Sequence, residues 1–180
     1  TGVADLSIAE LSMIDHVFLT HSHLDHIASL PLMIDTVADR RSKPLVVYAT
    51  EAVLTILRNH IFNWAIWPDF SEIPTAEAPF MRFQSIEVGE EIDLHGRKFT
   101  ALPVEHTVPA VGYRLDSGKA SLVFSGDTGP CDALWQAVNQ IDNLRHVIVE
   151  CAFPDSEAPL AVLSKHLCPS MLALELRKLE

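Results

Sequence analysis

Six consecutive residues near the start of the chain hold its densest group of metal-binding side chains. The segment His21–His26 reads His-Ser-His-Leu-Asp-His and offers three imidazoles and one carboxylate. Imidazole and carboxylate together suit zinc, manganese or iron. Side chains two positions apart in an extended backbone point the same way, so His21 and His23 can reach one metal ion. Asp25 and His26 follow where the chain is expected to turn into a helix, and they can face a neighbouring metal position.

Three further residues of the same chemical types lie past the ends of predicted strands. They are His106 after Lys98–Val104, Asp127 after Ser121–Ser125, and His166 after Arg145–Glu150 by a longer connection. Each residue alone is weak evidence for a ligand. Strand ends that converge on one place commonly carry the functional side chains of an α/β protein, so we expect these residues to complete the metal site. Glu150, at a strand end, is expected to orient a ligand histidine.

The predicted elements give an α/β (α+β) chain with a sheet-on-sheet core flanked by helices. Apolar and β-branched runs predict strands at Ile14–Thr20, Leu45–Tyr48, Met81–Glu87, Glu91–Leu94, Lys98–Val104, Ala110–Leu115, Ser121–Ser125 and Arg145–Glu150. Helices are expected at Ile27–Asp39, Glu51–His60 with Thr50 as N-cap, Cys131–Gln140 and Met171–Lys178. The segment Asn63–Pro79 is expected to be a long loop, of the kind that often binds ligands.

Length and charge narrow the class of protein. The chain has 180 residues and a net charge of −11, which suits one domain over residues 1–180. A surface that binds a nucleic-acid polymer needs Lys and Arg to replace counterions. Because the chain is strongly acidic, a nucleic-acid polymer is not expected as a partner. No apolar run is long enough to cross a bilayer, and a membrane partner is not expected either. The three scattered cysteines (Cys131, Cys151 and Cys168) fit reduced thiols.

The first motif resembles a known family. Thr20–His26 is similar to the THxHxDH signature of the metallo-β-lactamase superfamily, and the later ligand-type residues follow in the order of that family. The resemblance implies an αββα sandwich with two divalent transition metals, zinc first, with manganese or iron as alternatives. It assigns His21, His23 and His106 to one metal, Asp25, His26 and His166 to the other, and Asp127 to both.

A narrower resemblance covers Ile14 to Leu172. The stretches IDHVFLTHSHLDHIASLP, NHIFNWAIWPDF, VFSGDTGP and SKHLCPSML are similar to the class II 3′,5′-cyclic-nucleotide phosphodiesterases. This implies hydrolysis of a small-molecule substrate, cyclic AMP or also cyclic GMP, to the 5′-monophosphate by a hydroxide shared between two metals. Asp25, Asp127 and His166 are then the expected catalytic residues. Asn63, Trp67 and Lys165 are the expected substrate contacts.

One departure from the family concerns the start of the chain. Only 13 residues precede the predicted strand Ile14–Thr20, whereas the family has strands there, so we expect the first sheet to lack its opening strands. The scattered cysteines favour a reducing compartment, so the predicted compartment is the cytoplasm. The chain begins with Thr rather than Met, which leaves the periplasm as an alternative. An incompletely paired sheet invites association, which leaves a homodimer open.

Other functions stay in competition at this point. Gly112-Tyr113-Arg114 after His106 also resembles the RNA-processing (tRNA 3′-end) endonucleases of the same superfamily. A thioester or β-lactam hydrolase shares the first motif. A non-catalytic metal module fits less well, because structural zinc is normally closed by four ligands. Trp64, Trp67 and Phe70 can stack on a base or simply fasten their own loop.

Overall fold

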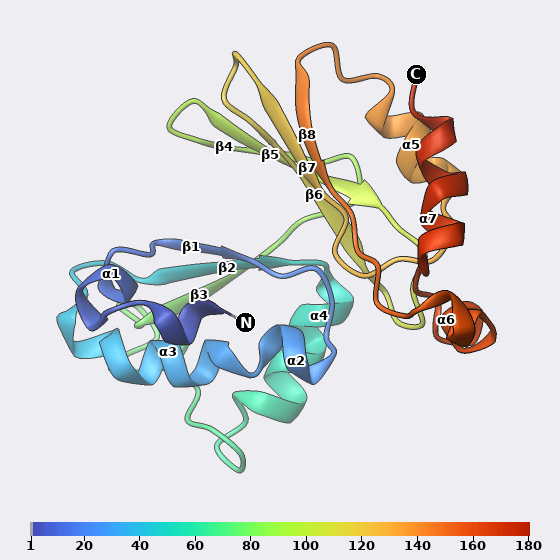
Figure 1. Cartoon of the computed structure of the whole chain (residues 1–180). Helices are drawn as coiled ribbons and strands as arrows, with labels where there is room; N and C mark the ends of the chain where they lie inside the picture. Colours follow the sequence, from blue (N-terminus) through green and yellow to red (C-terminus); the bar gives the residue numbers. More distant parts are fainter. Residues whose placement is uncertain (1) are drawn as a thin grey trace. The chain divides into compact units, whose positions relative to one another are not determined.

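The computed structural model describes residues 2–180, which form two compact units divided between Ile86 and Glu87. Figure 1 traces the elements of each unit. The first unit is built on a parallel sheet of three strands in the order β1-β2-β3. These strands are β1 (His16–Phe18), β2 (Leu45–Ala49) and β3 (Met81–Ser85). Parallel neighbours need crossover connections, and helices make both of them here.

The helices of the first unit cover its sheet with apolar side chains. They are α1 (Ile8–Ser12), α2 (Leu24–Ile27), α3 (Ser29–Val37) and α4 (Glu51–Ile56), which a π-helical turn at Leu57–Ile61 extends. Ser7 and Glu10 form a capping box at the start of α1, which satisfies two N–H groups at that helix end. Ile34, Leu54 and Met81 are buried in a single apolar cluster. This packing fixes the direction of the chain as it leaves β1.

The second unit carries a five-stranded sheet in the order β4-β5-β6-β7-β8. The strands are β4 (Glu91–Leu94), β5 (Arg97–Pro103), β6 (Val111–Asp116), β7 (Ser121–Phe124) and β8 (Leu144–Ile148). All neighbours are antiparallel except β7 and β8, which run parallel and are joined through helix α5 (Asp132–Val138). Consequently the carboxyl ends of β5, β7 and β8 lie at the same edge of this sheet, and the chain leaves each strand there.

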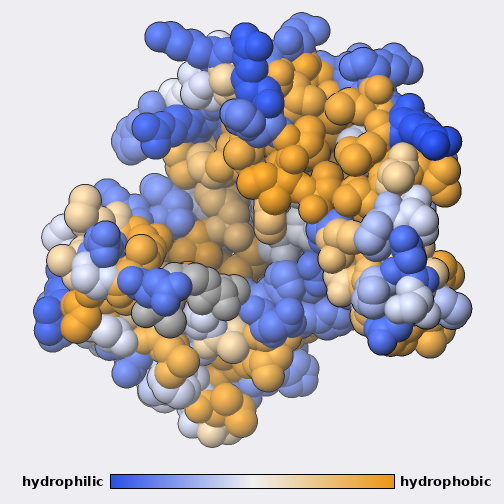
Figure 2. Space-filling view, in the orientation of Figure 1, coloured by the Kyte–Doolittle hydropathy of each residue, from blue (hydrophilic) through white to orange (hydrophobic). Residues whose placement is uncertain are grey.

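Two further helices follow β8 in the second unit, α6 (Ala158–Ser164) and α7 (Pro169–Glu175). The buried carboxylate of Glu175 in α7 accepts hydrogen bonds from the indole of Trp135 at 2.8 Å and from the backbone of Cys131 at 3.0 Å. This fastens α7 against α5. Figure 2 shows hydrophobic surface over strands β7 and β8, where Phe124 and Ile148 are exposed.

The α/β class and all eight predicted strands are confirmed, with ends that differ by a few residues. Strand β1 keeps only three residues of the predicted Ile14–Thr20. Helices α1 and α6 were not predicted, and the Asn63–Pro79 segment is an irregular loop with one isolated bridge between Pro74 and Pro79. Within residues 2–180, no helix has the length and apolar character needed to cross a bilayer. The single domain over residues 1–180 stays a prediction.

Candidate metal centre

The first ligand-type residues lie where the chain leaves β1. Pairing with β2 continues one residue beyond the strand, because the Leu19 N–H donates to the Tyr48 carbonyl at 2.9 Å. The His21 side chain that follows is fully buried. Its Nε2 lies 3.1 Å from Nδ1 of His23. The spacing argument, which placed these two imidazoles on one side of an extended segment, is confirmed.

Asp25 and His26 lie in the single turn of helix α2. His23, which precedes this helix, has an extended backbone. The His26 ring lies 4.1 Å from that of His21 between centroids. Nε2 of His26 is 3.2 Å from the carboxylate of Asp25, whose side chain is 79% exposed. The turn from strand to helix therefore gathers all four residues in one cluster of the first unit, with Asp25 on its open side.

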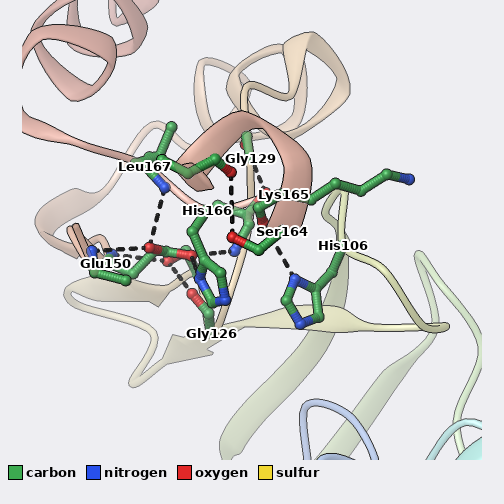
Figure 3. A network of polar contacts seen from close by, with 12 residues as sticks. His106, Gly126, Gly129, Glu150, Ser164, Lys165, His166 and Leu167 are labelled. Carbon is green, nitrogen blue, oxygen red and sulfur yellow. Dashed lines mark hydrogen bonds and ion pairs between the residues drawn. The ribbon is translucent and has the colours of Figure 1, made fainter. Parts of the chain in front are cut away.

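The second unit brings together two histidines that are 60 residues apart. The rings of His106 and His166 meet edge to face with centroids 4.9 Å apart. Nδ1 of His106 lies 3.2 Å from the carbonyl oxygen of Lys165, and Nδ1 of His166 lies 2.7 Å from a carboxylate oxygen of Glu150 (Figure 3). Both partners accept only, so Nδ1 of each ring donates, and Nε2 is the nitrogen left to face a metal ion.

Glu150 joins the segments around this pair of histidines. The oxygen that accepts from His166 also accepts from the Thr128 N–H at 2.7 Å. The other oxygen accepts from the N–H groups of Leu167 and Ala152, both at 3.2 Å. Four hydrogen bonds occupy the acceptor sites of a carboxylate. Glu150 therefore orients His166 as expected, rather than offering a metal ligand of its own.

Asp127 lies in the turn that follows β7. Gly126 precedes it with φ of +61°, a conformation that glycine adopts without steric cost. One ligand atom each from Asp127, Glu150 and His166 lie within 4.8 Å of one another. The second unit thus brings two histidines and one aspartate together from three strand ends, while their role as metal ligands stays a prediction.

The chemistry of these donors fits divalent transition metals. Ligand histidines typically donate their second nitrogen to a carboxylate or a backbone carbonyl, which fixes the tautomer that binds the metal. His106 and His166 have this arrangement. The structure places His21, His23, Asp25 and His26 in the first unit and His106, Asp127 and His166 in the second, and each group is consistent with a metal-binding role.

The three predicted substrate contacts have other partners. Asn63 donates to the Asn59 carbonyl at 2.9 Å and accepts from two N–H groups of its own turn. Trp67 packs against the apolar core of the first unit. The Lys165 ammonium forms an ion pair with Glu105. These contacts support loop fastening for Trp67, while the substrate roles of all three stay predictions.

Some residues of this centre were not predicted. Glu105, Thr128 and Gly129 connect the loops that carry His106 and Asp127: the Glu105 N–H donates to the Thr128 hydroxyl at 3.1 Å, and the Gly129 N–H donates to the Glu105 carbonyl at 2.7 Å. The Gly-Asp-Thr-Gly sequence was the available signal for Thr128 and Gly129. Glu105 has no motif of its own, and its contact with Lys165 joins residues 60 positions apart.

Most of the chain is similar to a known domain family. The family model of the beta-lactamase superfamily domain matches residues 4–176. The chain is 28% identical over 182 residues to a probable 3′,5′-cyclic-nucleotide phosphodiesterase of Yersinia pestis, covering 93% of this chain and 51% of that protein. It is 31% identical over 147 residues to a ribonuclease Z of Mycobacterium bovis, covering 74% of this chain and 51% of that protein.

Among solved structures, unliganded yeast PDE1 superposes with a TM-score of 0.79 at 22% identity, covering 93% of this chain and 52% of that one. At this identity the likeness shows the fold. The metallo-β-lactamase fold and the family resemblance inferred from the sequence are confirmed. The chain spans about half the length of the curated relatives it matches.

Proposed function

The chain belongs to the beta-lactamase superfamily, and on that premise we propose that it is a metal-dependent phosphodiesterase that hydrolyses 3′,5′-cyclic nucleotides to 5′-monophosphates. The observation that carries the proposal is the similarity to a cyclic-nucleotide phosphodiesterase over 93% of the chain. The match to a ribonuclease Z covers 74%, and RNA processing is therefore the second candidate function.

The proposed metal ligands are the seven residues predicted from the sequence. They are His21, His23, Asp25, His26, His106, Asp127 and His166, which would hold two divalent metal ions, with zinc as the first choice and manganese or iron as alternatives. Two such ions would polarise the phosphoryl oxygens and make a bound water acidic near neutral pH.

Residues of the chain orient the ligand histidines and offer a proton acceptor. The carbonyl of Lys165 and the carboxylate of Glu150 accept from Nδ1 of His106 and His166, so in both rings Nε2 is the nitrogen that would bind a metal ion. The exposed carboxylate of Asp25 can accept a proton from the attacking water at an Oδ atom. Asp25, Asp127 and His166 are the proposed catalytic residues.

The proposed substrate suits the charge of the chain. A cyclic nucleotide carries one negative charge and one base, so it needs no broad basic surface. Lys165 would meet the phosphate through an ammonium that pairs with Glu105 in this structure. Asn63 and Trp67 belong to the loop that would lie against the base, where stacking contributes about 1–3 kcal/mol.

The test compares substrates on the metal-loaded full chain. We expect release of 5′-AMP from cyclic AMP, with cyclic GMP as a second substrate, and little cleavage of precursor tRNA or of a β-lactam. Asp127→Ala should lower turnover by at least about 100-fold. Loss of a residue that only orients a metal ligand typically costs about 10–100-fold, and Asp127 is proposed to be a ligand itself. Asp142→Ala is the matched control, since Asp142 is exposed in the same unit. Efficient tRNA cleavage without cyclic-nucleotide turnover would replace this proposal with RNA processing.

A further inference from the structure

The backbone of Lys165 has a conformation that is unusual for its residue type. Lys165 ends helix α6 with φ of 53° and ψ of 53°, in the left-handed region. A residue with a β-carbon adopts this conformation only at a steric cost, because the β-carbon comes too close to the following carbonyl oxygen. The strain is maintained by the surrounding contacts, and residues held in such regions cluster at functional sites.

The turn places the carbonyl oxygen of Lys165 at His106. That oxygen lies 3.2 Å from Nδ1 of His106, and the next residue in the chain is His166. A single residue thus connects the two histidines of this unit: its carbonyl sets the tautomer of His106, and its backbone angles set where His166 begins. Figure 3 shows Lys165 beside His106 and His166, with its ammonium directed away from their rings.

Gly129 lies close to this backbone. A β-carbon at Gly129 would come within 3.3 Å of Cα and 3.4 Å of the carbonyl carbon of Lys165. The 3.3 Å contact is tighter than ordinary van der Waals separation, so a side chain at Gly129 would require the Lys165 backbone to shift by a few tenths of an ångström. The Gly129 N–H also donates to the Glu105 carbonyl, which keeps Gly129 beside the segment that carries His106.

The ammonium group of Lys165 contributes less to this arrangement. It pairs with Glu105, but the two side chains are 42% and 55% exposed. Exposed ion pairs contribute little to the stability of a protein. The geometry around His106 therefore depends on the main chain of Lys165 rather than on its charge.

We propose that Lys165 is a positioning residue that acts through its left-handed backbone, presenting its carbonyl to Nδ1 of His106 so that Nε2 of His106 faces the metal centre. The proposal rests on the proposed function in one respect, the assignment of His106 and His166 as ligands. It differs from the predicted role of Lys165 as a phosphate contact, which would depend on the ammonium.

Two substitutions at the same position separate these roles. Lys165→Asn and Lys165→Val both remove the ammonium, but Asn tolerates the left-handed region whereas a β-branched residue strongly disfavours it. We expect the Nδ1–H resonance of His106, measured by nitrogen-15 NMR on the metal-free full chain, to persist in Lys165→Asn and to disappear or shift in Lys165→Val. Zinc affinity should stay within about 3-fold for Asn and fall by about 10–100-fold for Val, the range typical of residues that orient metal ligands.

Gly129→Ala tests the same contact from the opposite side. It should weaken the His106 Nδ1–H signal and zinc binding while the ammonium of Lys165 is unchanged. Equal losses in the Asn and Val variants, with an unaffected Gly129→Ala protein, would overturn the proposal and favour the ammonium. Thermal melting identifies a variant that has failed to fold, and Lys165→Gly then replaces Lys165→Asn as the variant that retains the backbone. Neither readout involves substrate, so failure of the proposed cyclic-nucleotide activity is seen separately.

Discussion

At the scale of single residues, Glu150 connects three loop segments through one carboxylate. Replacing it with Gln leaves one carbonyl oxygen and introduces an NH2 group that faces backbone N–H donors. At least one buried donor then loses its acceptor, and His166 loses the charged partner of its Nδ1. We expect Glu150→Gln to lower metal affinity by about 10–100-fold, measured by competition with a chelator of known affinity.

Glu157→Gln provides the control for this change, because Glu157 is an exposed carboxylate of the same unit. Its metal affinity should equal that of the parent protein. Equal affinities for all three proteins would mean that Glu150 does not orient a ligand. The role of Glu150 was predictable because it ends a strand near ligand-type residues. The roles of Glu105 and Gly129 were not, because they depend on loops meeting from distant parts of the sequence.

At the scale of elements, a buried arginine ties the first helix to the sheet it flanks. The Arg41 guanidinium is 2% exposed and donates to the carbonyls of Ser12 and Ile14 and to Asp15 at 2.6–2.9 Å. Burial raises the pKa of Asp15, but hydrogen bonds from Lys43 and Arg41 outweigh it and hold this pKa below its usual 3.8. The stabilisation from this pair is therefore present above pH 3.8 and lost as pH falls through the lowered pKa.

Arg41→Ala should lower the free energy of unfolding by about 2–4 kcal/mol near neutral pH, because buried carbonyls lose a charged donor. Urea unfolding at neutral pH measures this value, and repeating it near pH 3 should give a smaller difference. Arg40→Ala is the matched control, since Arg40 is 57% exposed and its loss should change stability by less than about 0.5 kcal/mol. A deficit shared by both variants would contradict the role of Arg41.

The elements themselves were predictable to different degrees. Strands β5 and β7 have strong apolar patterns and end near the predicted residues. Helix α6 was missed because its sequence, Ala-Pro-Leu-Ala-Val-Leu-Ser, has apolar residues on every side and no polar face to reveal a helical period. Helix α1 is five residues long, too short for periodicity, and only its Ser-x-x-Glu capping box marks it. Tertiary contacts, not local pattern, decide such segments.

At the scale of the whole molecule, the net charge of −11 bears on substrate choice. A protein that binds a polynucleotide releases counterions, so its affinity falls steeply as salt rises, with a slope of about −0.7 per phosphate contacted on a single strand. A cyclic nucleotide has one phosphate, so added salt weakens only one attractive ion contact. Added salt also screens the repulsion between the acidic chain and the nucleotide, over a Debye length of about 10 Å.

These two opposing effects predict that kcat/KM for cyclic AMP changes by less than about 3-fold between roughly 50 and 200 mM salt. A base-free phosphodiester, assayed in parallel, is the control for salt effects on the metal centre itself. The ratio of the two rates isolates recognition of the nucleotide. A fall of more than about 10-fold for a polynucleotide cleaved by the same protein, with cyclic AMP untouched, is the counterion-release behaviour of an RNA-processing enzyme. A flat ratio means that salt does not affect recognition of the base, and a flat cyclic AMP rate beside it means that the positive charge meeting the phosphate comes from the site and not from the protein surface.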